Sequence, residues 1–197
     1  MATNASDAPP GHLPAVLIAS DGRHPVYAPP GLDAGVLVRD TDLAALAHRV
    51  ASDCPPLAVD LDSVAGLGSD DVAVDFITGR LGIHVVLTRR PQLAARVAER
   101  GFLGLVHVFG YDSTGMGRSL EAHPRTERIG SVLSPGLVIV HLRSDELADL
   151  PRPIVAYGLI DDVEDARACM ALADAIVVRP TIAAKLAAQI EASLVPG

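Results

Sequence analysis

Charged and polar side chains follow the ends of short apolar runs, and two of these groups have the types and spacing of a binding site. Asp60 and Asp62 are two residues apart, so at the end of an extended strand both carboxylates face one side and can share a cation or a ligand. The sequence Thr88-Arg89-Arg90 places two guanidinium groups at the end of another run, which suits an anionic ligand or an RNA phosphate.

Each of these groups also has a structural interpretation. An Asp-x-Asp sequence at a strand end fits a turn whose carboxylates are solvated or bond the local backbone. We prefer that interpretation for Asp62, whereas for Asp60, deeper in the strand, both interpretations stand equal. Arg89 is the candidate for ligand binding, and Arg90 is expected to pair with a carboxylate or to remain in water.

His107 lies inside the apolar run 103–109, where a lone imidazole is more often a hydrogen-bonded core or barrel-mouth residue than a catalyst. No nucleophile or carboxylate stands at a triad-like position, so nucleophilic catalysis is not supported. The other histidines lack metal-ligand spacing, and Cys54 and Cys169 form no CxxC pair. We therefore expect no metal, cofactor or disulfide.

Elements that can position these residues are visible as eight apolar runs bounded by turn residues: 14–19, 35–38, 57–61, 83–87, 103–109, 129–133, 154–157 and 175–178. Segments with apolar residues at helical spacing separate most of them. Capping signals precede several of these helices: Asp40, Thr41 or Asp42; Ser69 with Asp70 and Asp71; and Asp161 with Glu164.

Repeated strand and helix units indicate parallel strands joined by crossover helices. Eight units favour a small TIM-type (β/α)8 barrel. Residues 21–35 contain Gly22, Pro25, Pro29, Pro30 and Gly31, so we predict that the first helix is missing or shortened. Residues 1–11 are expected to be a mobile leader and residues 12–197 one domain.

The functional end of such a barrel is the end where the strands finish and the following loops begin. Gly158 follows the seventh run and Arg179 ends the eighth, in the region where barrels frequently bind phosphate; a tight turn is the other interpretation of Gly158. The polar or turn-forming residues at these ends are Ser20, Asp21, Asp40, Thr41, Asp60, Asp62, Thr88, Arg89, His107, Asp112, Ser113, Ser134, Tyr157, Gly158 and Arg179.

The composition limits the class of protein. Of 197 residues, 49% are hydrophobic and only 3% aromatic, which suits a core of small aliphatic side chains, as in parallel α/β sheets. The formal net charge of -8 argues against a simple basic nucleic-acid surface. Apolar runs are too short to cross a bilayer, so we expect a soluble cytoplasmic protein.

Taken in order, several of these motifs resemble the glycerol-3-phosphate-responsive antiterminator family. The motifs are Val59-Asp60-Leu61, Gly66-Leu67-Gly68-Ser69-Asp70-Asp71, Val85 to Arg89, Phe109 to Ser113, and Gly158-Leu159-Ile160. The resemblance runs from about Leu13 to the last helix. It implies a TIM-type barrel that binds glycerol 3-phosphate and leader RNA, and regulates transcription antitermination in glycerol metabolism.

The resemblance places Asp40 with Thr41, Asp60, Thr88 with Arg89, Asp112 with Ser113, and Gly158 on motif positions. Ala58, His107, Tyr157 and Arg179 depart from the pattern. Tyr157 stands where the family has a glycine, which closes the close backbone approach to a phosphate, and Arg179 is expected to replace that contact through its side chain. His107 and Arg179 therefore join the ligand-binding candidates.

The residues leave other functions open. A barrel enzyme acting on a phosphorylated metabolite, with Asp60 or His107 as acid or base, is one alternative, and a binding barrel for such a metabolite is another. An open acidic pocket in which those two residues converge would favour the enzyme. The only lysine, Lys185, is not at a strand end, which argues against Schiff-base chemistry. The residues favour a regulator over an enzyme, and the oligomeric state stays open.

Overall fold

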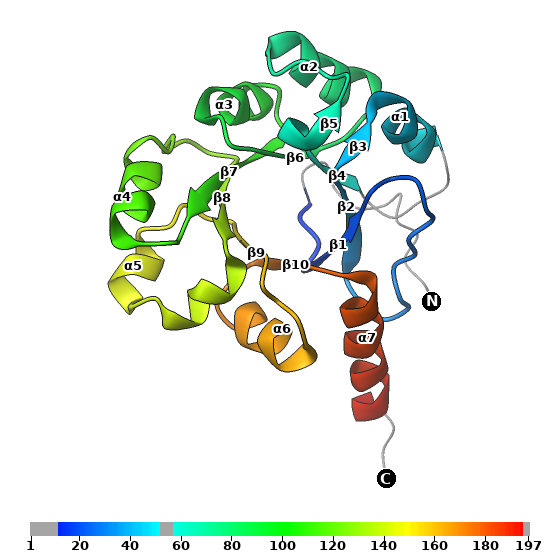
Figure 1. The fold of residues 1–197 in the computed structure, drawn as a ribbon, viewed down its shortest axis with the longest axis vertical. Coiled ribbons are helices and arrows are strands. Elements are labelled where there is room, and N and C mark those ends of the chain that lie inside the picture. Colours follow the sequence, from blue (N-terminus) through cyan, green and yellow to red (C-terminus); the bar gives the residue numbers. More distant parts are fainter. Residues whose placement is uncertain (1–11, 52–56, 195–197) are drawn as a thin grey trace.

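A computed structural model describes residues 12–51 and 57–194. Eight parallel strands close into a barrel in the order β1-β10-β9-β8-β7-β6-β4-β2 (Figure 1). The strands are β1 Val16–Ser20, β2 Ala34–Val38, β4 Leu57–Asp60, β6 Val85–Thr88, β7 Leu103–Phe109, β8 Ile129–Ser134, β9 Ile154–Tyr157 and β10 Ala175–Val178. Each overlaps one of the predicted apolar runs, so the predicted TIM-type barrel is confirmed.

Helices surround the barrel (Figure 1). They are α1 Leu43–Ala51, α2 Asp71–Asp75 with a π-helical continuation Phe76–Arg80, α3 Pro91–Glu99, α4 Ser113–Glu121, a 3-10 helix Gly136–His141, α5 Ser144–Ala148, α6 Val163–Met170 and α7 Pro180–Leu194. Among the expected caps, Asp70 accepts the Ala73 amide at 2.9 Å. The cap of α6 is Asp162, which directly precedes the helix and accepts the Asp165 amide at 2.9 Å, whereas Asp161 forms an ion pair with Arg179.

The predicted loss of the first helix is confirmed, since residues 21–33 contain no helix between β1 and β2. The structure adds a feature that was not predicted, a pair of two-residue parallel strands, β3 Thr41–Asp42 and β5 Val64–Ala65. Strands this short carry no sequence periodicity. They tie the loops after β2 and β4 together beside the barrel mouth.

The barrel interior is an apolar plug that positions the residues above it. It contains Leu17, Leu37, Ala58, Val85, Leu87, Leu103, Leu105, Val132, Val155, Ala175 and Val177, all buried. Neighbouring strand residues such as Val36, Val59 and Val86 face outward and pack with the helices. Successive strand residues point to opposite faces, so the residue two positions after a plug residue also faces the interior, one layer nearer the mouth.

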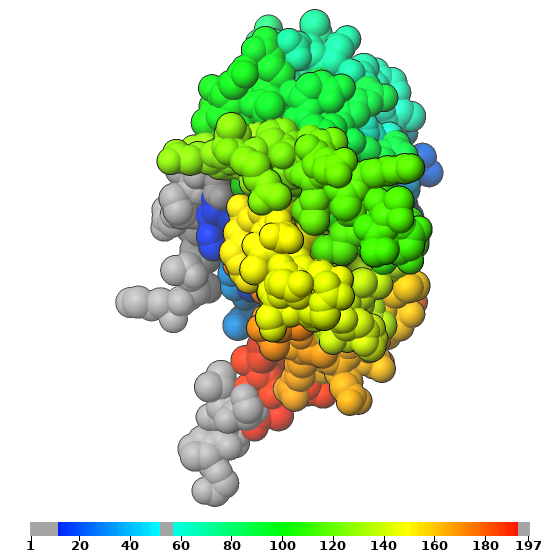
Figure 2. All heavy atoms as spheres, turned by 90° about the vertical axis from the view of Figure 1, so that its left-hand side faces the viewer, coloured from blue at the N-terminus to red at the C-terminus, as the bar shows by residue number. Residues whose placement is uncertain are grey.

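Parts of the sequence predictions fall outside the described residues, namely the expected leader, residues 1–11, and Cys54. Cys169 is buried and forms no disulfide with any described residue. Within residues 12–51 and 57–194, no helix has the length and apolar character needed to span a membrane. Figure 2 shows the face formed mainly by α4, α5 and the segments between them.

Candidate functional site

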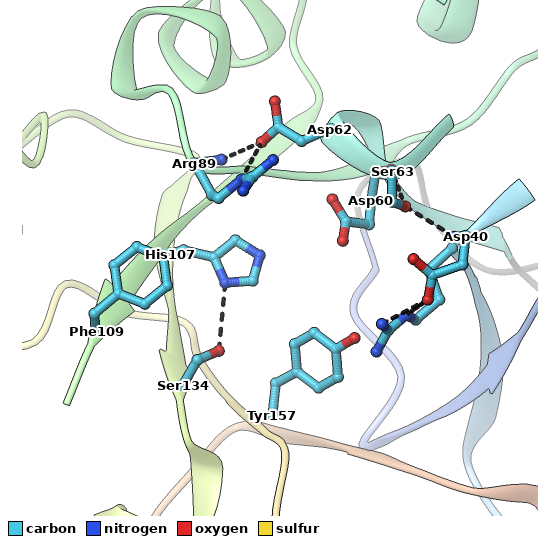
Figure 3. Close-up of a pocket in the computed structure, with 10 residues that line it drawn as sticks. Asp40, Asp60, Asp62, Ser63, Arg89, His107, Phe109, Ser134 and Tyr157 are labelled. Atoms are coloured by element: carbon cyan, nitrogen blue, oxygen red, sulfur yellow. Dashed lines mark hydrogen bonds and ion pairs between the residues drawn. The ribbon is translucent and has the colours of Figure 1, made fainter. Parts of the chain in front are cut away.

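A pocket of about 360 Å³ opens at the carboxyl ends of the barrel strands (Figure 3). Its walls consist of charged, hydroxyl and aromatic side chains: Arg39, Asp40, Asp60, Asp62, Ser63, Arg89, His107, Phe109, Ser134 and Tyr157. Most of these residues end a barrel strand or follow it at once, as expected for the functional end of this fold.

The alternation of strand residues explains which side chains reach the pocket. Six of its residues stand two positions after a residue of the apolar plug: Arg39, Asp60, Arg89, His107, Ser134 and Tyr157 follow Leu37, Ala58, Leu87, Leu105, Val132 and Val155. They form the polar layer above the plug. The pocket therefore has an apolar floor and polar walls drawn from six different strands.

Asp62 organises one wall of the pocket. One of its oxygens accepts the Thr88 hydroxyl at 3.0 Å and the backbone N–H of Arg89 at 2.5 Å. The guanidinium Nε atoms of Arg89 and Arg90 lie 3.6 and 3.8 Å from the carboxylate. The Asp62 side chain is only 4% exposed, so the interpretation of Asp62 as a solvated turn residue is wrong. A buried carboxylate needs such partners, and here the last residue of β6 and the two residues after it supply them.

The opposite wall is built by Arg39, Asp40 and Ser63. Arg39 is paired with Asp40 at 2.6 Å, and its guanidinium carbon lies 5.2 Å from the centre of the Tyr157 ring. The Ser63 hydroxyl donates to the Asp60 carbonyl at 2.9 Å and accepts the Asp40 amide at 3.0 Å. Asp40 has a φ of 49°, a conformation that this hydrogen bond and the β3 and β5 pairing hold in place.

Two titratable groups in the pocket have shifted pKa values. Burial, with a further contribution from the charge of Asp62, raises the pKa of Asp60 to about 6. Burial lowers the pKa of His107 to about 4, so its imidazole is neutral at pH 7. The His107 Nδ1 lies 3.3 Å from the Ser134 hydroxyl. Its ring stacks on Phe109 with centroids 6.0 Å apart, and Phe109 stacks on the exposed Tyr111 at 6.1 Å.

Four of the predicted ligand-binding residues meet in this pocket: Asp40, Asp60, Arg89 and His107. The other five do not line it. Thr88 is fully buried and bonded to Asp62. Asp112 caps α4 by accepting the Gly115 amide at 2.7 Å, and Ser113 is the first residue of that helix.

Gly158 and Arg179 also lie outside the pocket lining. Gly158 has a φ of 94°, which supports the interpretation of this glycine as a turn residue. The Arg179 guanidinium turns to the Asp161 carboxylate at 3.0 Å, and its side chain is 63% exposed. The expected role of Arg179 as the phosphate contact therefore has no support in the geometry, because Asp161 already satisfies this cation.

The pocket contains residues that were not predicted as ligand-binding from the sequence. Arg39, Ser63 and Phe109 are absent from the predicted strand-end residues, whereas Asp62, Ser134 and Tyr157 are strand-end residues without a predicted ligand contact. One signal was available for several of them: counting two residues on from each inward-facing apolar position identifies Arg39, Ser134 and Tyr157. Ser63 and Phe109 follow no such rule, since Ser63 belongs to a short 3-10 helix, Leu61–Ser63.

This arrangement defines a TIM-type barrel with a small polar pocket at its functional end, holding two guanidiniums, three carboxylates and a neutral imidazole. No cluster of potential metal ligands occurs among residues 12–51 and 57–194. The chain belongs to the glycerol-3-phosphate responsive antiterminator family, whose pattern it matches over residues 37–190. No curated protein sequence matches it significantly.

Solved structures support the same fold. The chain is similar to a glycerol uptake operon antiterminator-related protein from Thermotoga maritima, with a TM-score of 0.67 and 19% identity, covering 88% of this chain and 99% of that one. The chain is also similar to a glycerol uptake operon antiterminator regulatory protein from Listeria monocytogenes, with a TM-score of 0.66 and 18% identity. This match covers 83% of this chain and 90% of that one. The chain is similar as well to an aldolase called QR15, with a TM-score of 0.60 and 15% identity, covering 82% of this chain and 84% of that one.

Proposed function

We propose that this chain is an RNA-binding transcription antiterminator whose pocket binds glycerol 3-phosphate or a closely related phosphorylated polyol. The observation that carries the proposal is that Arg89 and Arg39 lie in one pocket together with side chains that can bind hydroxyl groups. The chain also belongs to a glycerol-3-phosphate responsive family. Guanidiniums hold phosphate oxygens, and carboxylates and hydroxyls bind the hydroxyls of a polyol.

Arg89 is the main phosphate contact in this proposal. Its side chain is 61% exposed, and its Nε lies 3.6 Å from Asp62, beyond a normal hydrogen bond, so its donors are available to a ligand. Arg39 is held more tightly, at 2.6 Å from Asp40. In this proposal the hydroxyl groups of the polyol are bound by Asp60, Ser134 and Tyr157.

The charges in the pocket set a limit on the affinity. Three carboxylates, Asp40, Asp60 and Asp62, face two guanidiniums, so a phosphate enters a pocket that is net negative when all three are ionised. The ligand must therefore share Arg89 with Asp62. We expect binding that is weak, made by side chains, and tighter at low ionic strength.

Titration calorimetry with glycerol 3-phosphate tests this proposal, with glycerol and inorganic phosphate as reference ligands. Arg89→Ala should weaken binding by about 10-fold to 100-fold, the value of one or two charge-assisted hydrogen bonds. Arg179→Ala is the matched control, since Arg179 is also an exposed strand-end arginine but is paired with Asp161. Equal affinity of wild type and Arg89→Ala would contradict the assignment, and the absence of binding by the wild type would contradict the proposed ligand.

Arginines outside the pocket support the RNA part of the proposal. Two arginines in α3 and directly after it are neutralised, because Arg96 pairs with Asp71 and Glu99, and Arg100 pairs with Asp75. From α4 to the start of β8, three exposed arginines, Arg118, Arg125 and Arg128, have no ion pair with any described carboxylate. We assign the RNA phosphate contacts to this segment, although Glu121 and Glu127 reduce its net charge.

Binding of a transcript that carries a terminator hairpin, measured at several salt concentrations, tests this assignment. Replacing Arg118, Arg125 and Arg128 by alanine should weaken binding and reduce the slope of log affinity against log salt by about one for each phosphate that the variant no longer binds. Arg96→Ala is the control, since that arginine is already paired. An unchanged slope in the triple variant would exclude this segment. Measuring with and without glycerol 3-phosphate shows whether the two sites are coupled.

A further inference from the structure

Two side chains in the pocket have the arrangement of an acid and base pair. Asp60, at the end of β4, and His107, in β7, are both directed into the pocket (Figure 3). We propose that this pocket catalyses enolisation of small phosphorylated α-hydroxycarbonyl compounds, with Asp60 as the base and His107 as the donor to the carbonyl oxygen. The inference rests on the proposed function in one respect, that the same pocket accepts a phosphorylated three-carbon molecule.

Asp60 has the properties of a general base. Within the described part of the chain, its carboxylate forms no ion pair and no side-chain hydrogen bond, whereas Asp62 is bonded to Thr88 and Arg89 and Asp40 is paired with Arg39. The Asp60 carboxylate accepts a hydrogen bond from the Asp62 backbone N–H and is the pocket carboxylate that no described side chain engages, so it remains able to take a proton from a ligand. Its pKa of about 6 makes it a stronger base than an ordinary aspartate while leaving it largely ionised at pH 7.

His107 has the properties of a neutral hydrogen-bond donor. Its low pKa keeps the ring uncharged, and its Nδ1 lies 3.3 Å from the Ser134 hydroxyl. When Ser134 donates to Nδ1, the ring proton is on Nε2, which faces the pocket in Figure 3. A neutral imidazole beside a carboxylate of raised pKa is an established pairing for removing a proton next to a carbonyl group, because the imidazole stabilises the oxyanion that forms.

The proposed step is balanced without a further reactant. Asp60 takes a proton from the carbon next to the carbonyl, and the electron pair of that C–H bond forms the carbon–carbon double bond. The carbonyl electron pair moves to oxygen, where His107 Nε2 donates a hydrogen bond to the enolate. Return of this proton from Asp60 to the same carbon regenerates the starting molecule. In D2O the proton on the Asp60 carboxyl group first exchanges with solvent, so Asp60 returns a deuteron and the carbon acquires deuterium. Arg89 holds the phosphate during this exchange.

Other features of the pocket separate this reaction from related ones. The only lysine, Lys185, lies on α7 and does not line the pocket, so carbonyl activation through a Schiff base is not available here. Enolisation needs only a base and an oxyanion donor. Both are present, Asp60 at the end of strand β4 and His107 in strand β7.

The test is deuterium uptake from D2O into dihydroxyacetone phosphate, followed by proton NMR. Wild type should exchange the protons next to the carbonyl at least about 100-fold faster than Asp60→Asn, the usual contribution of a general base. His107→Gln should also be slower. Asp70→Asn is the matched control, since Asp70 is an aspartate at the same end of the barrel that caps α2 outside the pocket, and asparagine keeps the cap. It should exchange like wild type.

The rate should also rise with pH as Asp60 ionises, with a midpoint near its pKa of about 6. If wild type and Asp60→Asn prepared identically exchange at the same rate, the proposal is wrong. Glycerol 3-phosphate has no carbonyl group and cannot enolise, so its binding is measured separately by calorimetry. Binding without exchange in the wild type would overturn the enolisation and leave the proposed ligand in place, whereas the absence of both would overturn the two together.

Discussion

The Asp62 carboxylate lies 2.5 Å from the backbone nitrogen of Arg89 and 3.6 Å from its Nε. A residue that follows β4 therefore fixes both the backbone and the guanidinium of a residue that follows β6. The contact places Arg89 at the pocket edge and leaves its terminal guanidinium N–H groups able to donate to a ligand. It also puts a negative charge near Asp60, whose pKa rises in part for that reason.

Asp62→Asn should tighten binding of glycerol 3-phosphate and lower the pKa of Asp60. The amide keeps an acceptor for Thr88 and the Arg89 backbone but removes the negative charge that competes with the phosphate for the Arg89 guanidinium. Removing a like charge favours ionisation of Asp60, so its pKa should move from about 6 toward the ordinary 3.8. NMR titration of the Asp60 carboxyl group measures this change. A pKa that stays the same would show that burial alone sets it.

Asp60→Asn should stabilise the protein at pH 7. The pKa of Asp60 is about 6 in the folded state and 3.8 in the unfolded state, so between these pH values the folded state binds more protons. The contribution of Asp60 to the free energy of unfolding is therefore complete below pH 3.8 and is lost as the pH rises through 6. The cost at pH 7 is of the order of 2 to 3 kcal/mol. Charged groups facing Asp60 are Asp62, Arg39 and Arg89. Urea unfolding at pH 7 and pH 4 should show a gain at pH 7 that disappears at pH 4.

His107→Gln should remove a loss of stability that acid causes in the wild type between pH 6.5 and 4. The folded-state pKa of His107, about 4, is below the ordinary 6.5, so the unfolded state binds more protons in this window and the wild type loses stability as the pH falls. The effect opposes that of Asp60, and the two nearly cancel in the wild type between pH 4 and 6. Urea unfolding across this range should show a steeper gain on acidification in the variant than in the wild type.

Gly136→Ala should destabilise the protein and disturb the pocket. A Cβ at Gly136 would lie 2.3 Å from the Tyr157 backbone nitrogen, so the chain at the end of β9 must move. Overpacking of this kind costs about 1 to 3 kcal/mol. Gly117→Ala is the matched control, because a Cβ there meets nothing within 4 Å in helix α4, and alanine should stabilise by up to about 1 kcal/mol. Thermal unfolding of both variants measures the contrast, and equal effects would contradict it.

Tyr157→Gly should raise the affinity for glycerol 3-phosphate while lowering stability. The family resemblance places a glycine at this position, and removing the ring opens the backbone after β9 to a phosphate. The variant loses the packing of Tyr157 on the apolar plug and its contact with Arg39. Tyr157→Phe keeps the ring and removes only the phenol hydroxyl, so it should bind somewhat more weakly than wild type. Calorimetry on the two variants decides, and unchanged or weaker binding by the glycine variant would contradict a phosphate position at this strand end.

The strands and their order around the barrel were predictable from the sequence. Eight apolar runs overlap the eight barrel strands, because a strand buried on both faces needs uninterrupted aliphatic residues. The proline and glycine residues of the first connection excluded a helix there for a local reason, the fixed φ and missing N–H of proline. The end of the barrel that carries the polar pocket followed from chain direction alone, since all strands are parallel.

The tertiary structure determined which partner each polar side chain contacts and whether it lines the pocket. Asp62 is buried because the end of β6 and the residues after it bring Thr88, Arg89 and Arg90 to its carboxylate. Arg179 does not line the pocket, and its guanidinium pairs with Asp161 at 3.0 Å. Both partners are distant in sequence, and long flexible side chains choose among partners by distance and charge. Local sequence therefore determined which residues reach the barrel mouth, whereas contacts between different strand ends determined which of them face the ligand.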